Sequence, residues 1–352
     1  MAIRLIEAGT VSHLRSQTIY HGLAYARTAV TPPTIVLATP AEPYVCVGFH
    51  QDIKAEIDLE YCASKSLPVL RRETGGGAVY LDIDQLFVQW VMGSDQLPAR
   101  LERRFALFLR PMVETYRAFG VHAEVRPVND VQVDGRKVVG TGAAHIGNAE
   151  VLVGNFIFDF DKDAMARILK VPSDAFRREV RASLEEYMAS TRQLCGEDLD
   201  PRAVAATYIQ ECAEALKTPL EPGAFTAEEE AAIASMDEQL STSEFRYGGG
   251  GLRRPGVKIH EDVYVAEATR DAPALRVTAR IRSGRLESVT IGGSGQVNTL
   301  ADQIRGLQIA REPITHAVRR WLRGAGETQF TEPTLVDTIL ELTTPQPART
   351  TP

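Results

Sequence analysis

The order of hydrophobic and polar positions divides the chain into short strand-like runs and longer helix-like runs. Two β-branched runs, TIVLATP (34–40) and YVCVGFH (44–50), are separated by Ala-Glu-Pro and predict two strands with a tight connection. Between 98 and 119 the apolar positions recur instead at helical spacing, which predicts a long helix with one buried face. These apolar residues are Leu101, Phe105, Leu109, Met112, Tyr116 and Phe119.

Two hairpin turns stand out along the chain. Asp134-Gly135 lies between VQV and RKVV, and Ser283-Gly284 lies between ALRVTARIR and RLESVTIGG. A glycine at the second turn position accepts the positive φ that tight hairpin turns demand. Lys137 is therefore predicted to lie just past a turn, on a strand.

The length of 352 residues exceeds one typical domain and favours two. Helical segments are expected at 162–170, 173–188 and 200–216, before the composition becomes acidic near residue 220. We interpret 1–222 as a first, catalytic domain, 223–244 as a partly helical connector and 245–352 as a second domain. Amphipathic helices in the second domain are expected near 298–306, 313–323 and 333–342.

Composition narrows the possible classes of protein. With 44% hydrophobic and 24% charged residues, the chain is typical of a soluble globular protein. A formal net charge of -7 argues against a nucleic-acid partner, which would favour a basic face. No apolar run approaches the ~18 residues of a membrane-spanning helix, and the N-terminal residues lack the apolar core of a signal peptide. We expect no membrane association and a cytoplasmic location.

The cysteines do not form a recognisable site. Cys46, Cys62, Cys195 and Cys212 include no CxxC pair and no histidine at metal-ligand spacing. We expect buried thiols rather than a zinc site or a disulfide framework.

The stretch RRETGGGAVYLD (71–82) sets a glycine-rich turn beside two arginines. Without Cβ atoms, Gly75, Gly76 and Gly77 let backbone amides approach an anionic or flat ligand closely. Arg72 adds a planar fork suited to phosphate oxygens. A bulge or turn between strands with a surface arginine explains this stretch equally well when it is taken alone.

A second stretch, NDVQVDGRKVVGTG (129–142), carries Asn129 and Asp130 before the hairpin and Lys137 after it. Small residues come after the lysine. The stretch is not a Walker loop, because GxxxxGK[ST] is absent and the lysine precedes its glycines. A lone lysine on a strand is more often a solvated edge charge, so the second stretch gains weight only beside the first.

Together the two stretches resemble lipoate-protein ligases. RRETGGGAVYLD is similar to the R-R-x-[ST]-G-G-G-A-V-x-x-D signature of that family, and DGRKVVGTGA to its G-x-K-[VI]-x-G-[ST]-A segment about sixty residues later. The resemblance extends over most of residues 1 to 220 and includes HGLAYAR near the start. It implies an α+β fold, with a mixed, largely antiparallel sheet that carries helices on one side, and a small C-terminal α+β accessory domain.

The resemblance also implies a two-step reaction. Lipoate and Mg-ATP give lipoyl-adenylate and pyrophosphate, and a lysine of an acceptor protein then takes the lipoyl group. Carried over by motif position, Lys137 is the catalytic residue and touches both the lipoyl carbonyl and the α-phosphate. Asn129 and Asp130 fall in the adenine and metal neighbourhood, with Asp130 as the Mg²⁺ ligand. The residues expected to bind the nucleotide and its phosphates are Arg72, Gly75, Gly76, Gly77, Ala78, Val79, Tyr80, Asn129, Asp130 and Lys137.

A lysine in that position has a physical reason. Placed between a carbonyl and a phosphate, its compact positive charge stabilises the negative charge that develops during acyl transfer. The apolar runs 34–40 and 44–50 are suited to wall a slot for the aliphatic tail.

Two other functions stay open. Octanoyltransferases of the same superfamily use a cysteine thiolate, but no cysteine lies between Cys62 and Cys195, a span that holds both motifs. Cys46 remains a candidate to approach the pocket from its strand. A non-catalytic carrier-binding module on the same fold is the alternative from another class, and the intact Arg72, glycines and Lys137 argue against it.

Two positions depart from the family pattern. Val153, Gly154 and Asn155 stand where many lipoate ligases carry His-Gly-[ST], and Leu81 replaces the histidine that comes after the aromatic residue. The departures suggest a divergent branch. Candidate acceptors are a glycine cleavage H-like protein, an E2 lipoyl domain or a sulfur-oxidation lipoate-binding protein.

Overall fold

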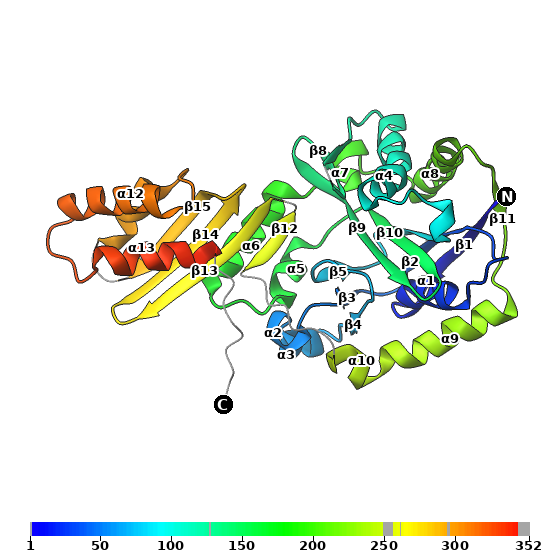
Figure 1. The fold of residues 1–352 in the computed structure, drawn as a ribbon, viewed down its shortest axis with the longest axis horizontal. Coiled ribbons are helices and arrows are strands. Elements are labelled where there is room, and N and C mark those ends of the chain that lie inside the picture. The colour runs from blue at the N-terminus through cyan, green and yellow to red at the C-terminus, as the bar shows by residue number, and fades with distance from the viewer. Residues whose placement is uncertain (1, 127, 249–255, 261, 294–295, 344–352) are drawn as a thin grey trace. The chain divides into compact units, whose positions relative to one another are not determined.

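The structure, a computed structural model, describes residues 2–126, 128–248, 256–260, 262–293 and 296–343. Its chain groups into two compact units (Figure 1). The first unit comprises Met1–Leu169 and Met188–Gly251, and the second comprises Lys170–Tyr187 and Leu252–Pro352. A segment from the middle of the chain therefore belongs to the second unit.

The first unit is built on an eight-stranded mixed sheet in the order β11-β1-β2-β6-β10-β9-β8-β7. β1 runs parallel to β2 and β11, and the other neighbours are antiparallel. The strands are β1 (Ile3–Val11), β2 (Thr34–Pro40), β6 (Gln85–Met92), β7 (Glu124–Arg126), β8 (Asp130–Val133), β9 (Arg136–Ile146), β10 (Ala149–Ile157) and β11 (Leu220–Pro222).

A small sheet, β4-β3-β5, completes the strands of the first unit, with β3 (Tyr44–Val47) between β4 (Val69–Arg71) and β5 (Val79–Leu81). The two runs expected at 34–40 and 44–50 are thus strands of different sheets. The helices of this unit are α1 (Arg15–Ala26), α2 (Ile53–Glu56), α3 (Leu59–Ser64), α4 (Leu101–Ala118), α5 (Lys162–Ile168), α7 (Thr191–Cys195), α8 (Pro201–Leu216), α9 (Ala227–Ser241) and α10 (Ser243–Gly248), with the 3-10 turn η1 (Ser94–Gln96).

Helices cover both faces of the large sheet, whereas the family resemblance implied helices on one side. Every residue of the central strand β6 is buried, so the strand has no face that water can solvate. On one face Trp90 packs on Phe108 of α4 and donates a hydrogen bond from Nε1 to the Tyr208 hydroxyl of α8 at 3.0 Å. On the other face Val91 shares an apolar cluster with α1 and α9.

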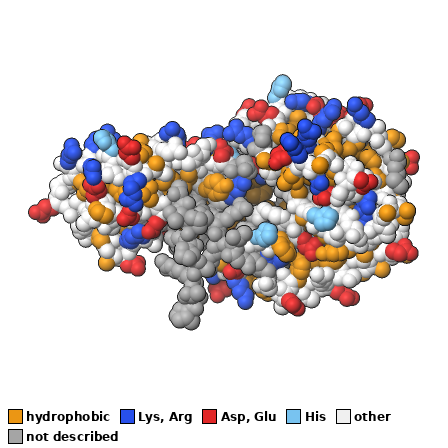
Figure 2. Space-filling model, in the orientation of Figure 1, with side chains coloured by type: hydrophobic (Ala, Val, Ile, Leu, Met, Phe, Trp, Pro, Cys, Tyr) orange, Lys and Arg blue, Asp and Glu red, His pale blue; other side chains and the backbone are white. Residues whose placement is uncertain are grey.

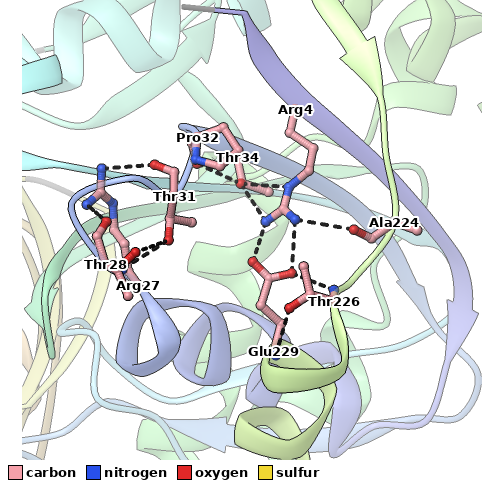
Figure 3. A network of polar contacts seen from close by, with 9 residues as sticks. All are labelled: Arg4, Arg27, Thr28, Thr31, Pro32, Thr34, Ala224, Thr226 and Glu229. Atoms are coloured by element: carbon pink, nitrogen blue, oxygen red, sulfur yellow. Dashed lines mark hydrogen bonds and ion pairs between the residues drawn. The ribbon is translucent and has the colours of Figure 1, made fainter.

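The segment expected as a connector, 223–244, is an integral part of the first unit. Its helix α9 lies along α1 so closely that a Cβ on Gly22 would come within 2.6 Å of the Ile233 backbone. Arg4 of β1 forms an ion pair with Glu229 of α9 and also bonds to Thr34 Oγ1 at 3.0 Å (Figure 3). Because Arg4 and Glu229 are largely shielded from water, loss of either partner would leave the other charge buried and unpaired, so the contact between α9 and the sheet depends on both.

The second unit is an antiparallel sheet in the order β12-β13-β14-β15 with helices on both faces. Its elements are α6 (Asp174–Tyr187), β12 (Val257–His260), β13 (Val263–Asp271), β14 (Ala274–Arg282), β15 (Arg285–Gly293), α11 (Leu300–Ile304), α12 (Arg311–Gly324) and α13 (Glu332–Leu340), with the 3-10 turns η2 (Val297–Thr299) and η3 (Glu341–Thr343). The expected second domain is therefore a compact α+β unit, as the resemblance implied.

Successive side chains of β14 point alternately to the two faces of the sheet, and each face packs against different helices. Val277 and Ala279 point into the apolar cluster with α11, α12 and α13, while Thr278 and Arg280 point to the opposite face. Helix α6 covers that opposite face, and Figure 1 shows it in green beside the yellow strands of the sheet. The sequence placed α6 in the first domain because nothing local marks the sheet that it covers.

On the face drawn in Figure 2, lysines and arginines are interspersed with acidic side chains over both units. Within the described residues no helix is both long enough and apolar enough to cross a membrane.

Candidate functional site

The glycine-rich segment joins β4 to β5 and is shaped by three glycines with different surroundings. Gly76 has φ +101°, and a Cβ there would meet Nη2 of Arg72 at 2.9 Å. Gly75 and Gly77 have open space where a Cβ would lie. Gly76 is therefore required by the backbone itself, while Gly75 and Gly77 leave room for close approach of a ligand.

Arg72 holds this segment together. Its Nη2 donates to the carbonyls of Gly75 and Gly77, both at 2.9 Å, and its Nη1 donates to the carbonyl of Cys46 at 3.1 Å. The side chain is 9% exposed. In this arrangement the guanidinium shapes the glycine segment; the predicted contact with phosphate stays a prediction.

Arg71, which the sequence reasoning left without a role, is a second anchor. It is 1% exposed and its guanidinium donates to the carbonyls of Phe49 (2.6 Å), Gln51 (2.8 Å) and Arg246 (3.0 Å). The bond to Arg246 ties the last helix before residues 249–255 to the signature. Those residues, most of the loop YGGGGLRRPG, lie outside the described part of the chain. In the sequence, Arg71 directly follows the apolar residues Val69 and Leu70, and a charge that continues an apolar run is the signal that could have pointed to this role.

His21 of α1 supports the same segment. It is fully buried, and burial lowers its pKa to about 4, so the ring is neutral near pH 7. Its Nδ1–H donates to the Gln17 carbonyl at 2.7 Å, which leaves Nε2 to accept the N–H of Glu73 at 3.2 Å. The motif HGLAYAR thus supplies a positioning histidine.

After the glycines, Ala78 leads into β5. Val79 pairs with Cys46 and Tyr80 with Val45 across the small sheet. Burial raises the pKa of the Tyr80 hydroxyl to about 12. Leu81, one of the departures from the family pattern, is buried in the apolar cluster of this small sheet.

The second stretch forms the predicted hairpin between β8 and β9. Asp134 and Gly135 have φ +49° and +76°, as a tight turn of this kind requires. Nζ of Lys137 lies 2.8 Å from Oδ1 of Asp130, and Asp130 is 2% exposed. The structure therefore brings the predicted catalytic lysine and the predicted metal ligand into one ion pair.

Asn129 and Thr141 complete this end of the hairpin. Thr141 Oγ1 donates to the Asn129 carbonyl at 2.6 Å and accepts from its Nδ2 at 3.0 Å. One residue further, Gly142 lies against the glycine segment, because a Cβ there would reach Thr74 at 3.4 Å. The two stretches that the sequence singled out therefore meet in space.

The residues that follow α6 hold the backbone of Lys137 in place. Its carbonyl accepts the N–H of Ala189 at 3.0 Å, and Lys137 and Met188 form a parallel β-bridge. The Tyr116 hydroxyl donates to the Val138 carbonyl at 3.1 Å and bonds to Thr191 Oγ1 at 2.9 Å. Sequence reasoning missed this brace because its partners are distant along the chain.

The second departure from the family pattern lies on β10. Asn155 Oδ1 accepts the N–H of Gly140 at 3.1 Å, and its Nδ2 donates to Gln85. A Cβ on Gly154 would come within 2.6 Å of Met112, so this glycine lets α4 pack on the sheet. These residues therefore stabilise the strand that carries Lys137.

The thiols are poorly suited to nucleophilic chemistry. Cys46, Cys62 and Cys212 are buried, and Cys195 is half-buried. Burial raises the pKa of all four, to about 11 for Cys62 and about 12 for Cys212. A raised pKa lowers the fraction of reactive thiolate at neutral pH.

Acidic side chains near the site do not form a ready-made metal centre. Within the described residues, no three His, Cys, Asp or Glu side chains are grouped to hold a metal ion. Burial raises the pKa of Asp82, the aspartate of the signature, to about 6, although hydrogen bonds from the Asp84 backbone and the Gln85 side chain lower it.

The fold and the two stretches define an enzyme of the lipoate ligase and octanoyltransferase family. The model of the lipoyl protein ligase A/B catalytic domain matches residues 19–213, and the chain belongs to that family. The octanoyltransferase LipM of Kyrpidia tusciae is 27% identical over 248 residues, which cover 64% of this chain and 90% of that protein.

Solved structures agree with the fold. A bi-partite lipoate protein ligase of Thermoplasma acidophilum, described with its E2 lipoyl domain, matches with a TM-score of 0.65 and 25% identity over 73% of this chain and 100% of that chain. A lipoate-protein ligase A bound with ATP matches with a TM-score of 0.61 and 23% identity over 70% of this chain and 99% of that chain. The predicted fold class and family are confirmed.

Proposed function

We propose that this chain is an ATP-dependent lipoate-protein ligase, which activates lipoate as lipoyl-AMP and transfers the lipoyl group to a lysine of an acceptor protein. The observation that carries the proposal is the pairing of Lys137 with Asp130 beside an open glycine segment, with no low-pKa thiol among the four cysteines. A fixed ammonium suits adenylate chemistry, whereas transfer through a thioester needs a thiolate.

In the first step a carboxylate oxygen of lipoate attacks the α-phosphorus of ATP, and pyrophosphate leaves. The Lys137 ammonium would stabilise negative charge on both the carbonyl and the α-phosphate oxygens. Gly75 and Gly77 allow the phosphates to approach the backbone closely, and Arg72 keeps that backbone in place. In the second step the acceptor amine attacks the acyl carbon, and AMP leaves.

Mg²⁺ is the metal implied for such a reaction. It is commonly bound through one or two carboxylates together with substrate phosphates, so a single buried aspartate fits that role. Asp130 would hold the ion, with Asn129 beside it, and the ion would neutralise phosphate charge. Because Asp130 also pairs with Lys137, the lysine and the metal ion would share the Asp130 carboxylate.

An octanoyl or lipoyl acyltransferase is the second candidate, favoured by the similarity to an octanoyltransferase. Cys46 is the cysteine nearest the signature along the small sheet, but it is 0% exposed and its pKa is raised. A non-catalytic carrier-binding module would have no need for the Lys137–Asp130 pair.

The acceptor we propose is a lipoyl-domain protein: an E2 lipoyl domain, a glycine cleavage H-like protein or a sulfur-oxidation lipoate-binding protein. The similarity to a ligase that was described with its E2 lipoyl domain supports the first of these. We propose a cytoplasmic location, where ATP and such acceptors are available.

The test is pyrophosphate release from ATP with lipoate, octanoate or biotin as the acid. The ligase is expected to release pyrophosphate with lipoate. It should keep doing so when Cys46, Cys62 and Cys212 are replaced by alanine and Cys195 by serine, since alanine adds no buried polar group. An acyl-thioester on the wild-type protein in the absence of ATP, seen by mass spectrometry, would instead identify the acyltransferase.

A further inference from the structure

Helix α6 belongs to the second unit, although the chain enters it from the first unit and returns to the first unit after it. At its C-terminal end the Tyr187 hydroxyl donates to Glu287 of β15 at 2.5 Å. Arg280 of β14 pairs with Glu186 at 2.7 Å. These bonds connect the last turn of α6 to the sheet of the second unit.

The start of α6 is held by a comparable bond. The Ser173 hydroxyl donates to Glu267 of β13 at 2.6 Å, and Thr278 donates to the same carboxylate at 2.7 Å. Phe176, Val180 and Leu184 are buried along the helix between these two ends. The helix is therefore expected to move with the second unit as one body.

The residues directly after α6 are fixed to Lys137. Met188, which comes next after Tyr187, forms the β-bridge with Lys137, and Ala189 donates its N–H to the Lys137 carbonyl. Ala189, Ser190 and Thr191 are each at most 2% exposed, and the Ser190 side chain caps α7. This short link is thus embedded in the first unit from its second residue onward.

The two ends of α6 differ in the number of residues that separate the helix from the nearest residue fixed in the first unit. Consecutive Cα atoms are about 3.8 Å apart, so the single peptide bond between Tyr187 and Met188 cannot absorb a displacement of α6. At the other end the four residues 170–173 separate Leu169, which bridges to Ile57, from the first residue of α6. A shift of the second unit is therefore transmitted to Lys137 sooner than to Ile57.

We propose that Met188 and Ala189 are positioning residues through which the second unit sets the place of Lys137. The inference rests on the proposed role of Lys137 in adenylate formation. When the second unit is in one position, α6 holds Met188 and Ala189 against the strand of Lys137; when it moves, that strand end is pulled or released. The second unit thereby controls the catalytic lysine without touching the substrate.

A matched pair of variants tests this link. Tyr187→Phe removes one hydroxyl anchor at the end of α6 next to Lys137, and Ser173→Ala removes one at the far end. In the full-length protein we expect Tyr187→Phe to lower kcat for pyrophosphate release roughly three- to thirtyfold, with KM for ATP and lipoate unchanged. Hydrogen exchange at the Ala189 amide should accelerate in the same variant. Ser173→Ala should change neither quantity.

A second pair of variants lengthens the segment at one end of α6 and leaves its hydrogen bonds to the second unit in place. Two glycines inserted between Tyr187 and Met188 should lower kcat more than Tyr187→Phe does, while the same insertion between Lys170 and Val171 should leave kcat near the wild-type value. Thermal unfolding of all four proteins shows that they are folded.

Unchanged kcat and unchanged Ala189 exchange in a folded Tyr187-Gly-Gly-Met188 variant would overturn the inference. Lys137→Ala, measured alongside, separates a failure of the proposed role of Lys137 from a failure of the link between α6 and Lys137. If it keeps full activity, the proposed role of Lys137 fails; if it is inactive while the insertion is not, only the link fails. The exchange measurement needs no turnover, so it decides on the link even if the wild-type protein releases no pyrophosphate.

Discussion

Lys137 and Asp130 form an ion pair across the β8–β9 hairpin, with 2.8 Å between Nζ and Oδ1, and the lysine is the more exposed partner. Each group therefore affects the other in two ways. The carboxylate fixes the ammonium where a ligand can meet it, and the ammonium compensates a carboxylate that is almost fully buried.

Removing the lysine should abolish most of the activity. Lys137→Ala is expected to lower adenylate formation about 100-fold or more, the scale of losing one donor to a developing oxyanion. Stopped or quenched assays of pyrophosphate release measure it. Normal pyrophosphate release from a folded variant would contradict the catalytic role.

Stability requires its own control, because Lys137→Ala removes the positive charge that pairs with Asp130. The double variant Lys137→Ala with Asp130→Asn should recover part of any lost unfolding free energy, since it removes the charge left behind, yet remain inactive. Urea unfolding of the two variants separates the structural effect from the catalytic effect.

The three glycines should respond differently to alanine. Gly76→Ala is expected to cost about 1 to 3 kcal/mol of stability, because its positive φ and the nearby Arg72 guanidinium oppose a Cβ. Gly77→Ala should leave the melting temperature unchanged and weaken ATP binding, because its Cβ would enter the open space where we propose that a phosphate binds. Calorimetric titration with ATP and thermal unfolding distinguish them; equal ATP affinity for Gly77→Ala and wild type would exclude a phosphate at this glycine.

His21 predicts an acid-sensitive step in stability. Burial lowers its pKa from 6.5 to about 4, so the unfolded chain takes up a proton below pH 6.5 that the folded protein does not bind until about pH 4. The contribution is complete above pH 6.5 and is lost as the pH falls towards 4, with a slope of up to about 1.4 kcal/mol per pH unit. His21→Gln should show a shallower decline of unfolding free energy between pH 7 and 4.5; an identical slope would mean that the buried ring does not govern it.

Truncation tests why two units are joined, and the structure sets the proper end point. A fragment ending at Pro222 would remove α9, whose Ile233 packs on Gly22 and whose Glu229 pairs with Arg4, so we expect it to unfold. A fragment ending at Gly248 keeps both α9 and α10, although it also keeps α6 without the sheet that α6 covers. It is expected to lose adenylation but still transfer lipoate from supplied lipoyl-adenylate to an acceptor domain. Adenylation by this fragment at the full-length rate would refute an accessory role for the second unit.

Local signals allowed much of this architecture to be predicted. Both hairpin turns could be inferred from Asp134-Gly135 and Ser283-Gly284, because a primed turn depends on the turn residues themselves. The meeting of the glycine segment with the lysine strand was implied by the family resemblance. By contrast, Arg71 and His21 act through backbone groups far along the chain, and no local pattern specifies such partners.

The acidic composition near residues 223–244 was misleading for the same reason. Its charges are typical of a solvated connector, yet Glu229 is buried against Arg4, and Asp237 pairs with Arg15. Side chains that are polar in the sequence become part of an interface once their partners are known. The roles of the site residues themselves stay predictions until activity is measured.

The placement of α6 also bears on how the protein is made. The ribosome completes this helix before any strand of the sheet that it covers has been synthesised, because β12 to β15 all come after it in the chain. During translation the apolar face formed by Phe176, Val180 and Leu184 has no sheet to pack against until β12 to β15 have been synthesised. An incomplete nascent chain that ends before β12 therefore carries the whole glycine signature and Lys137, the proposed catalytic residue, but lacks the sheet that α6 covers.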